Sequence, residues 1–176
     1  MLPHSRRIKS SNDRDKMRKA FGEKMLELAE KDSEVHLVVG DFGYSIFDEF
    51  IKKFPNRFHN LGICEQSMIG VAAGMAIEGL KPYVYTITPF LIERPFEQVK
   101  LDIDQQKTNV KLIGFADYPT HGPTHAELDG EKMASLLKNT KSFFPKSADE
   151  TKEAIEQAHN IQGPCFISLK KAPKTV

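Results

Sequence analysis

Apolar residues recur along this chain with two spacings, one helical and one typical of strands. Methionine, phenylalanine and leucine recur every three or four positions between residues 17 and 28, which predicts a helix over residues 13–31. A short apolar run at residues 35–39 predicts a buried strand. The same reasoning predicts helices at 46–54, 65–78, 90–107, 131–138 and 148–161, and strands at 57–61, 83–86, 110–115, 142–144 and 165–169.

Strands that alternate with helices in this order predict an α/β fold. We expect a single domain of three layers, α/β/α, in which helices cover both faces of a mainly parallel sheet. Ligands of such folds gather at the loops that follow the carboxyl ends of strands. Three loops of this chain qualify, at residues 40–45, 61–65 and 117–125.

The composition is that of an ordinary globular domain. Of 176 residues, 40% are hydrophobic, and the formal net charge of +1 gives no reason to expect a nucleic acid or a membrane as partner. Residues 1–12 read as a basic, solvated lead-in, so the domain is expected over residues 13–176. No run approaches 18 apolar residues, and the start lacks the apolar core of a signal peptide. The two cysteines lie in apolar runs without metal-ligand spacing, so we expect buried free thiols in a cytoplasmic protein.

Glu65 is the first candidate for chemistry. It begins the predicted helix 65–78, whose following turns are apolar and rich in small residues. An acidic residue in a first helical turn can simply be stabilised by the helix dipole. A partly buried carboxylate can also exchange a proton with a ligand. Downstream lie three apolar side chains that can hold a flat ring or belong to the core: Ile87, Phe90 and Phe96.

Two further loops carry polar side chains. The loop at 117–125 contains His121 and His125, whose spacing would suit zinc on a helix, but prolines and a glycine disfavour a helix there and no third ligand is evident. We therefore predict no metal site. The loop can present histidine to a substrate, because imidazole titrates near neutral pH, or it can be an ordinary surface loop. The run GDFG at 40–43 lacks the features of a phosphate loop and is interpreted as an acidic turn.

Three motifs in order give the sequence a family resemblance. They are RFHNLGICEQSM at 57–68 followed by GVAAGMA at 70–76, the stretch 86–103, and GPTH at 122–125. Together they resemble the pyrimidine-binding domain of transketolases and deoxyxylulose-phosphate synthases, over about residues 15–172. The resemblance implies the thiamine-diphosphate-binding fold of the pyrimidine type.

The resemblance also implies roles for residues. In that family the glutamate matching Glu65 hydrogen-bonds N1′ of the aminopyrimidine ring and favours the 4′-imino tautomer, which removes the thiazolium C2 proton. The resulting ylid attacks a ketose or 2-oxo acid donor, and a ketol or acyl unit passes to an aldehyde acceptor. By resemblance, Phe90 stacks on the pyrimidine ring and His125 lines the site near the thiazolium and the donor.

The resemblance places further cofactor contacts at Ile87, Asp41 and Ile63. His121 stands where the family often has an acid that contacts donor hydroxyls, which makes it a candidate catalytic residue and predicts an unusual donor.

The sequence lacks the Gly-Asp-Gly motif with a later Asn by which the family holds diphosphate and metal. The resemblance therefore implies a separate diphosphate-binding chain that holds Mg²⁺ or Ca²⁺. We expect a 2+2 heterotetramer with homodimer contacts, and a large apolar face on this domain that is buried only in the complex. The alternatives are a non-catalytic regulatory or scaffold subunit, and an unrelated nucleotide-binding α/β domain.

Overall fold

The computed structural model describes residues 13–41, 43, 45–115, 122–126 and 128–169. The expected lead-in at 1–12 and His121 lie outside these residues. The described elements are α1 (Asp13–Lys31), β1 (Val35–Val39), α2 (Asp48–Lys53), η1 (Pro55–Arg57), β2 (Phe58–Asn60), α3 (Glu65–Ile77), β3 (Lys81–Ile87), η2 (Pro89–Glu93), α4 (Phe96–Gln98), η3 (Val99–Gln105), β4 (Lys111–Phe115), η5 (Pro123–His125), α5 (Gly130–Ser135), β5 (Lys141–Phe143), α6 (Ala148–His159) and β6 (Cys165–Leu169).

The six described strands form one sheet in the order β2-β1-β3-β4-β6-β5, and every neighbouring pair is parallel. The predicted parallel sheet is confirmed. Strands β3, β4 and β6 are apolar and buried on both faces, as strands inside a covered parallel sheet must be. The two edge strands, β2 and β5, are short and partly exposed.

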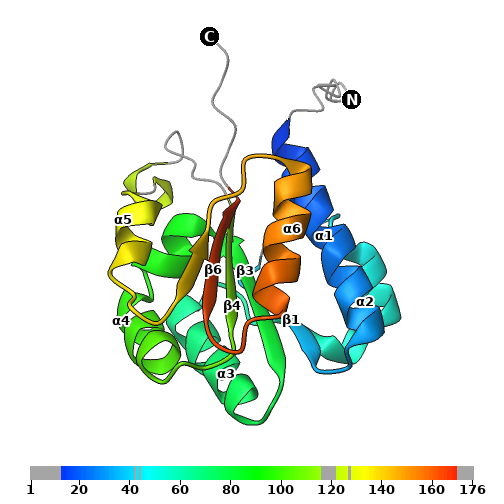
Figure 1. Cartoon of the computed structure of the whole chain (residues 1–176), viewed down its shortest axis with the longest axis horizontal. Coiled ribbons are helices and arrows are strands. Elements are labelled where there is room, and N and C mark those ends of the chain that lie inside the picture. Colours follow the sequence, from blue (N-terminus) through cyan, green and yellow to red (C-terminus); the bar gives the residue numbers. More distant parts are fainter. Residues whose placement is uncertain (1–12, 42, 44, 116–121, 127, 170–176) are drawn as a thin grey trace, which may run out of the picture.

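Helices cover both faces of the sheet, which confirms the three-layer prediction. Figure 1 shows α1, α2 and α6 on one side and α3, α4 and α5 on the other. Each side has its own buried cluster, one built mainly from α1 and α6 and the other from α3, η2, η3 and α5. Because all strands run the same way, their carboxyl ends lie at one edge of the sheet, where the loops predicted to bind a ligand begin.

Two expectations about local structure were wrong. Residues 90–107 do not form one helix: two π-helical segments, η2 and η3, flank the short α4, and Pro95 stands at the break between η2 and α4. A proline cannot donate the backbone hydrogen bond that an uninterrupted helix requires. The thiols also differ, because Cys165 is buried whereas Cys64 is only partly buried. Among the described helices, none combines the length and the apolar character that crossing a bilayer demands.

The contact between α1 and the segment before α2 depends on Gly22. A Cβ atom at this position would fall far inside van der Waals contact of the Ile46 carbonyl oxygen. By contrast, Gly74 in α3 has open space where a Cβ would lie.

We expect Gly22→Ala to lower the free energy of unfolding by about 1–3 kcal/mol, because overpacking outweighs the better helix propensity of alanine. The matched variant Gly74→Ala should raise it by up to about 1 kcal/mol, because there alanine gains propensity without a clash. Urea denaturation of the isolated chain measures both. Equal stability of Gly22→Ala and the wild type would contradict the close approach of Gly22 to the Ile46 carbonyl oxygen.

Candidate functional site

Glu65 lies at the amino end of α3 with a side chain that is 2% exposed. Its carboxylate is not left alone, because the Arg94 guanidinium donates a hydrogen bond from Nη1 to Glu65 Oε1 over 2.7 Å. A buried carboxylate is costly unless it is paired and hydrogen-bonded. The predicted partly buried carboxylate is therefore present, and it is held by a cation.

The same guanidinium also covers an aromatic ring. Arg94 Cζ lies 3.6 Å from the centroid of the Phe90 ring, within the range of a cation–π contact. Arg94 follows the π-helical turn η2, whose widened turn is closed by a hydrogen bond from the Arg94 amide to the Pro89 carbonyl oxygen, 3.1 Å long. Glu65, Arg94 and Phe90 thus form one contact group, built from α3 and η2.

The segment η2 begins close to the sheet because Gly114 of β4 has no side chain that would keep it away. Gly114 of β4 faces Thr88, and a Cβ on Gly114 would lie 2.6 Å from Thr88 Oγ1. A larger residue in β4 would therefore push away the segment that carries Phe90 and Arg94.

The imidazole ring of His125 also contacts the Phe90 ring. The two ring centroids are 4.8 Å apart at an interplanar angle of 65°, an edge-to-face arrangement. His125 Nδ1 is 3.1 Å from Thr124 Oγ1 in the same short turn, η5. The loop that follows is tied back to η2, because the Leu128 amide donates to Glu93 Oε1 over 2.8 Å. Two of the predicted site residues, Phe90 and His125, are therefore in contact.

Asn60 joins two of the predicted loops. Its Oδ1 accepts hydrogen bonds from the backbone amides of Asp41 and Gly62, each 3.0 Å long. Its Nδ2 lies 3.3 Å from Asp41 Oδ1. Asp41 has a φ of 52°, a conformation that asparagine and aspartate adopt more readily than most side chains do. The loops after β1 and β2 are thereby fixed to each other beside the start of α3.

The remaining predicted contacts are less closely grouped. Ile87 is the last residue of β3 and is buried. Ile63 is exposed in the loop before α3. The role of Ile63, Ile87 and Asp41 as cofactor contacts stays a prediction.

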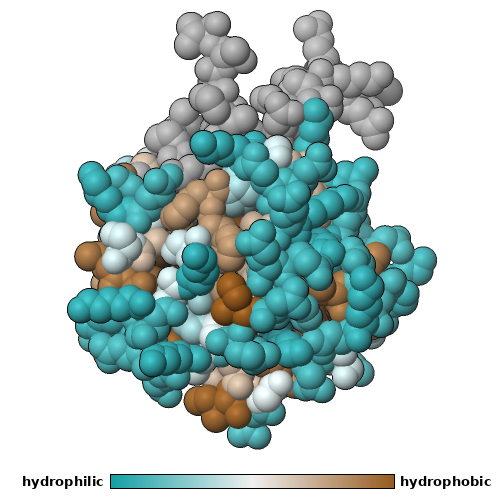
Figure 2. Space-filling model, in the orientation of Figure 1, coloured by the Kyte–Doolittle hydropathy of each residue, from teal (hydrophilic) through white to brown (hydrophobic). Residues whose placement is uncertain are grey.

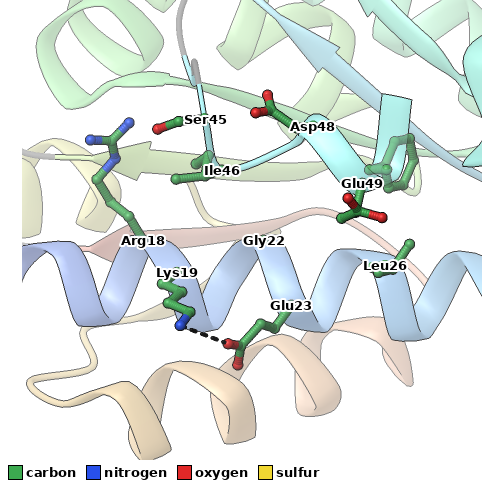
Figure 3. Close-up of a pocket in the computed structure, with 10 residues that line it drawn as sticks. Arg18, Lys19, Gly22, Glu23, Leu26, Ser45, Ile46, Asp48 and Glu49 are labelled. Carbon is green, nitrogen blue, oxygen red and sulfur yellow. Dashed lines mark ion pairs between the residues drawn. The ribbon is translucent and has the colours of Figure 1, made fainter. Parts of the chain in front are cut away.

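A pocket of roughly 570 Å³ lies elsewhere, between α1 and the segment 45–50 (Figure 3). Its lining mixes basic side chains, including Arg18 and Lys19, with acidic ones, including Glu23 and Asp48. None of the predicted site residues that the structure describes lines it. Within the residues that the structure describes, no three His, Cys, Asp or Glu side chains come together in a group suited to a metal ion.

Sequence reasoning gave no role in the site to Arg94, Glu93 or Asn60. A signal existed for Arg94, because it lies four positions after Phe90, and side chains at that spacing meet on a helix. Asn60 lies one residue before the end of the predicted strand 57–61, at the ligand-binding edge, which is also a recognisable place. Glu93 gives no comparable signal, because its partner is a backbone amide.

The chain is similar to known proteins both in sequence and in structure. The family described as "Transketolase, pyrimidine binding domain" matches residues 14–173. One subunit of the apulose-4-phosphate transketolase of Actinobacillus succinogenes is 42% identical over 123 residues, covering 68% of this chain and 40% of that protein. The protein of the same name from Phocaeicola vulgatus is 30% identical over 159 residues, covering 88% of this chain and 51% of that protein.

A solved structure described as a split gene transketolase, inactive beta4 tetramer, is also similar. It matches with a TM-score of 0.80 and 31% identity, covering 91% of this chain and 53% of that chain. This chain thus spans about half or less of the length of these relatives.

Removal of the Glu93 carboxylate should loosen the loop after His125. We expect Glu93→Ala to speed hydrogen exchange at the Leu128 amide several-fold, because that amide loses its acceptor. Glu93→Gln keeps a side-chain carbonyl and should exchange nearly as slowly as the wild type. Exchange followed by NMR or mass spectrometry measures this. Identical exchange in Glu93→Ala and the wild type would show that Glu93 does not hold the loop.

Proposed function

The chain belongs to the pyrimidine-binding domains of the transketolase family, and on that premise we propose that it binds the aminopyrimidine ring of thiamine diphosphate as one subunit of a two-chain transketolase-like enzyme. The observation that carries the proposal is the placement of one planar, hydrogen-bond-donating group between the Glu65 carboxylate and the Phe90 ring. An aminopyrimidine needs the same two partners, a carboxyl group that shares a proton with its ring nitrogen and a flat apolar surface. The residues present therefore fit the group.

Glu65 has the central role in this proposal. When bound, the cofactor would supply a nucleophilic thiazolium carbon and a cationic ring that takes up the electron pair released from the donor's carbon–carbon bond. The Glu65 carboxylate shares a proton with N1′ of the pyrimidine ring. Its burial keeps bulk water from competing for that proton.

In this proposal the other residues orient the cofactor and the donor and enclose them. Phe90 provides the flat surface for the pyrimidine ring, and His125, in edge contact with Phe90, is proposed to hold or move a proton on a donor hydroxyl or carbonyl oxygen. Ile87, at the end of β3, is proposed to close the cofactor site with an aliphatic side chain, and Asp41 and Ile63 to contact the cofactor at the rim of that site. Within this proposal, His121 is a selector of the donor.

The diphosphate and its Mg²⁺ are proposed to be held by a partner chain. The names of the relatives support this, because two are named as a single subunit of a transketolase and the structural relative is called a split gene transketolase. The same two names also favour transfer of a ketol unit between sugars over a decarboxylating reaction.

The flank of α3 that points away from the sheet is the proposed docking surface. Ile63, Val71 and Ile77 are exposed there, and Gly70 and Gly74 add no side chain beyond the helix backbone. Figure 2 shows hydrophobic side chains interrupting the polar surface at the end of the molecule where α3 lies in Figure 1. A partner seated on this flank would come next to Glu65, which begins the same helix.

Glu65→Gln tests the catalytic role. In the complex that a tagged full-length chain retrieves from its cell lysate, we expect donor consumption to fall by about 10²–10⁴-fold, because an amide cannot exchange the proton. The control Glu97→Gln alters an exposed acid at the start of α4 and should keep full activity. Full activity of Glu65→Gln would remove the proposal and favour the non-catalytic subunit.

Gly74→Leu tests the docking surface. The free chain should fold normally, because the new side chain meets open space, whereas affinity for the diphosphate-binding partner should fall by about tenfold or more as packing is blocked. The control Glu153→Leu places the same side chain on α6, across the sheet. Surface plasmon resonance with the purified partner measures both, and unchanged affinity of Gly74→Leu would exclude this flank.

A further inference from the structure

Arg94 makes both contacts that the proposed function assigns to the aminopyrimidine ring. Its Nη1 donates to Glu65 Oε1 over 2.7 Å, and its planar guanidinium lies 3.6 Å from the Phe90 ring centroid. We propose that Arg94 is a stand-in for the pyrimidine: it occupies the ring's place in the cofactor-free subunit and must swing out before thiamine diphosphate can bind. The inference rests on the proposed function and adds to it a competition inside the site.

The burial of the two partners explains why a stand-in is needed. Glu65 cannot turn to solvent, because it is 2% exposed at the start of a packed helix. Without a donor its carboxylate would be a buried, uncompensated charge, which is strongly destabilising. A guanidinium suits the task, because it is planar, permanently charged and able to stack on an aromatic face while it donates.

The exposure of Arg94 explains how its guanidinium can leave the position between Glu65 and Phe90. Its side chain is 33% exposed, so rotation about its own bonds carries the guanidinium into water. The departing charge is then solvated, and a proton taken up from water lies between the carboxylate and N1′ once the pyrimidine ring has arrived. The exchange involves no change of partner for the neighbouring Glu93, whose carboxylate stays on the Leu128 amide.

Phe90 is the surface for which the two groups compete. One face of the ring carries the guanidinium, and His125 touches the ring at 4.8 Å between centroids. A pyrimidine ring and a guanidinium cannot both lie on that face at Glu65. Cofactor affinity is therefore reduced by the fraction of subunits in which Arg94 occupies the place.

The test is cofactor binding, which is independent of turnover. Thiamine diphosphate with Mg²⁺ is titrated by calorimetry into the cofactor-stripped complex retrieved with the tagged full chain. We expect Arg94→Ala to bind about tenfold more tightly than the wild type, the size set by an ion pair and a cation–π contact that no longer compete. The cofactor-free Arg94→Ala complex should also melt at a lower temperature, because Glu65 has lost its donor.

Two further variants make the result decisive. Arg57→Ala is the matched control, because Arg57 Cζ lies 3.7 Å over the Phe54 ring in the same kind of contact, away from Glu65. It should leave the cofactor Kd unchanged. Arg94→Lys keeps the charge but not the flat shape, so it should bind the cofactor several-fold more tightly than the wild type even if Arg94→Ala does not fold.

The outcomes separate the two claims. Equal or weaker cofactor binding by the Arg94 variants, with a wild type that binds normally, overturns the stand-in and leaves the proposed function intact. A wild-type complex that does not bind thiamine diphosphate with Mg²⁺ overturns the proposed function and the stand-in with it.

Discussion

A carboxylate that is buried from water needs a hydrogen-bond donor at all times. The arrangement of the site around Glu65 follows from that requirement. Glu65 begins α3 and is almost fully buried, so its charge has to be matched within the protein. Arg94 meets the requirement from η2, and in doing so it covers Phe90, which in turn contacts His125. One electrostatic need thus joins three segments that are distant in sequence into a single group.

The parallel sheet brings these segments together. With all described strands running in one direction, the loops after β1, β2, β3 and β4 begin at the same edge. Asn60 fixes the first two loops to each other, and Gly114 lets η2 lie close to the sheet. The site is therefore supported by backbone contacts as much as by the side chains that would touch a ligand, as a preorganised site requires.

Periodicity predicted the sheet, the layers and most element positions, because long apolar patterns depend on burial alone; the strand at 165–169 has the predicted bounds. Glu65, Phe90 and His125 were predicted as site residues through their motifs, and that prediction remains one; the structure shows Glu65 buried and Phe90 in contact with His125. The single helix expected at 90–107 was wrong, since a shift to π-helical hydrogen bonding leaves little trace in hydrophobic spacing. The contacts of Arg94 and Glu93 were not predicted for a related reason: they depend on the exact turn of η2, which sequence spacing does not fix.

The π-helical turn at Pro89–Glu93 makes this site sensitive to chain length. Such a turn holds one residue more than an α-helical turn, so removal of one residue would restore the α-helix and rotate the following side chains by about 100°. A different residue would then face the carboxylate. A single-codon deletion in this stretch can therefore replace the group opposite Glu65 without any substitution, and homologous positions must be matched here by hydrogen-bonding pattern rather than by alignment column.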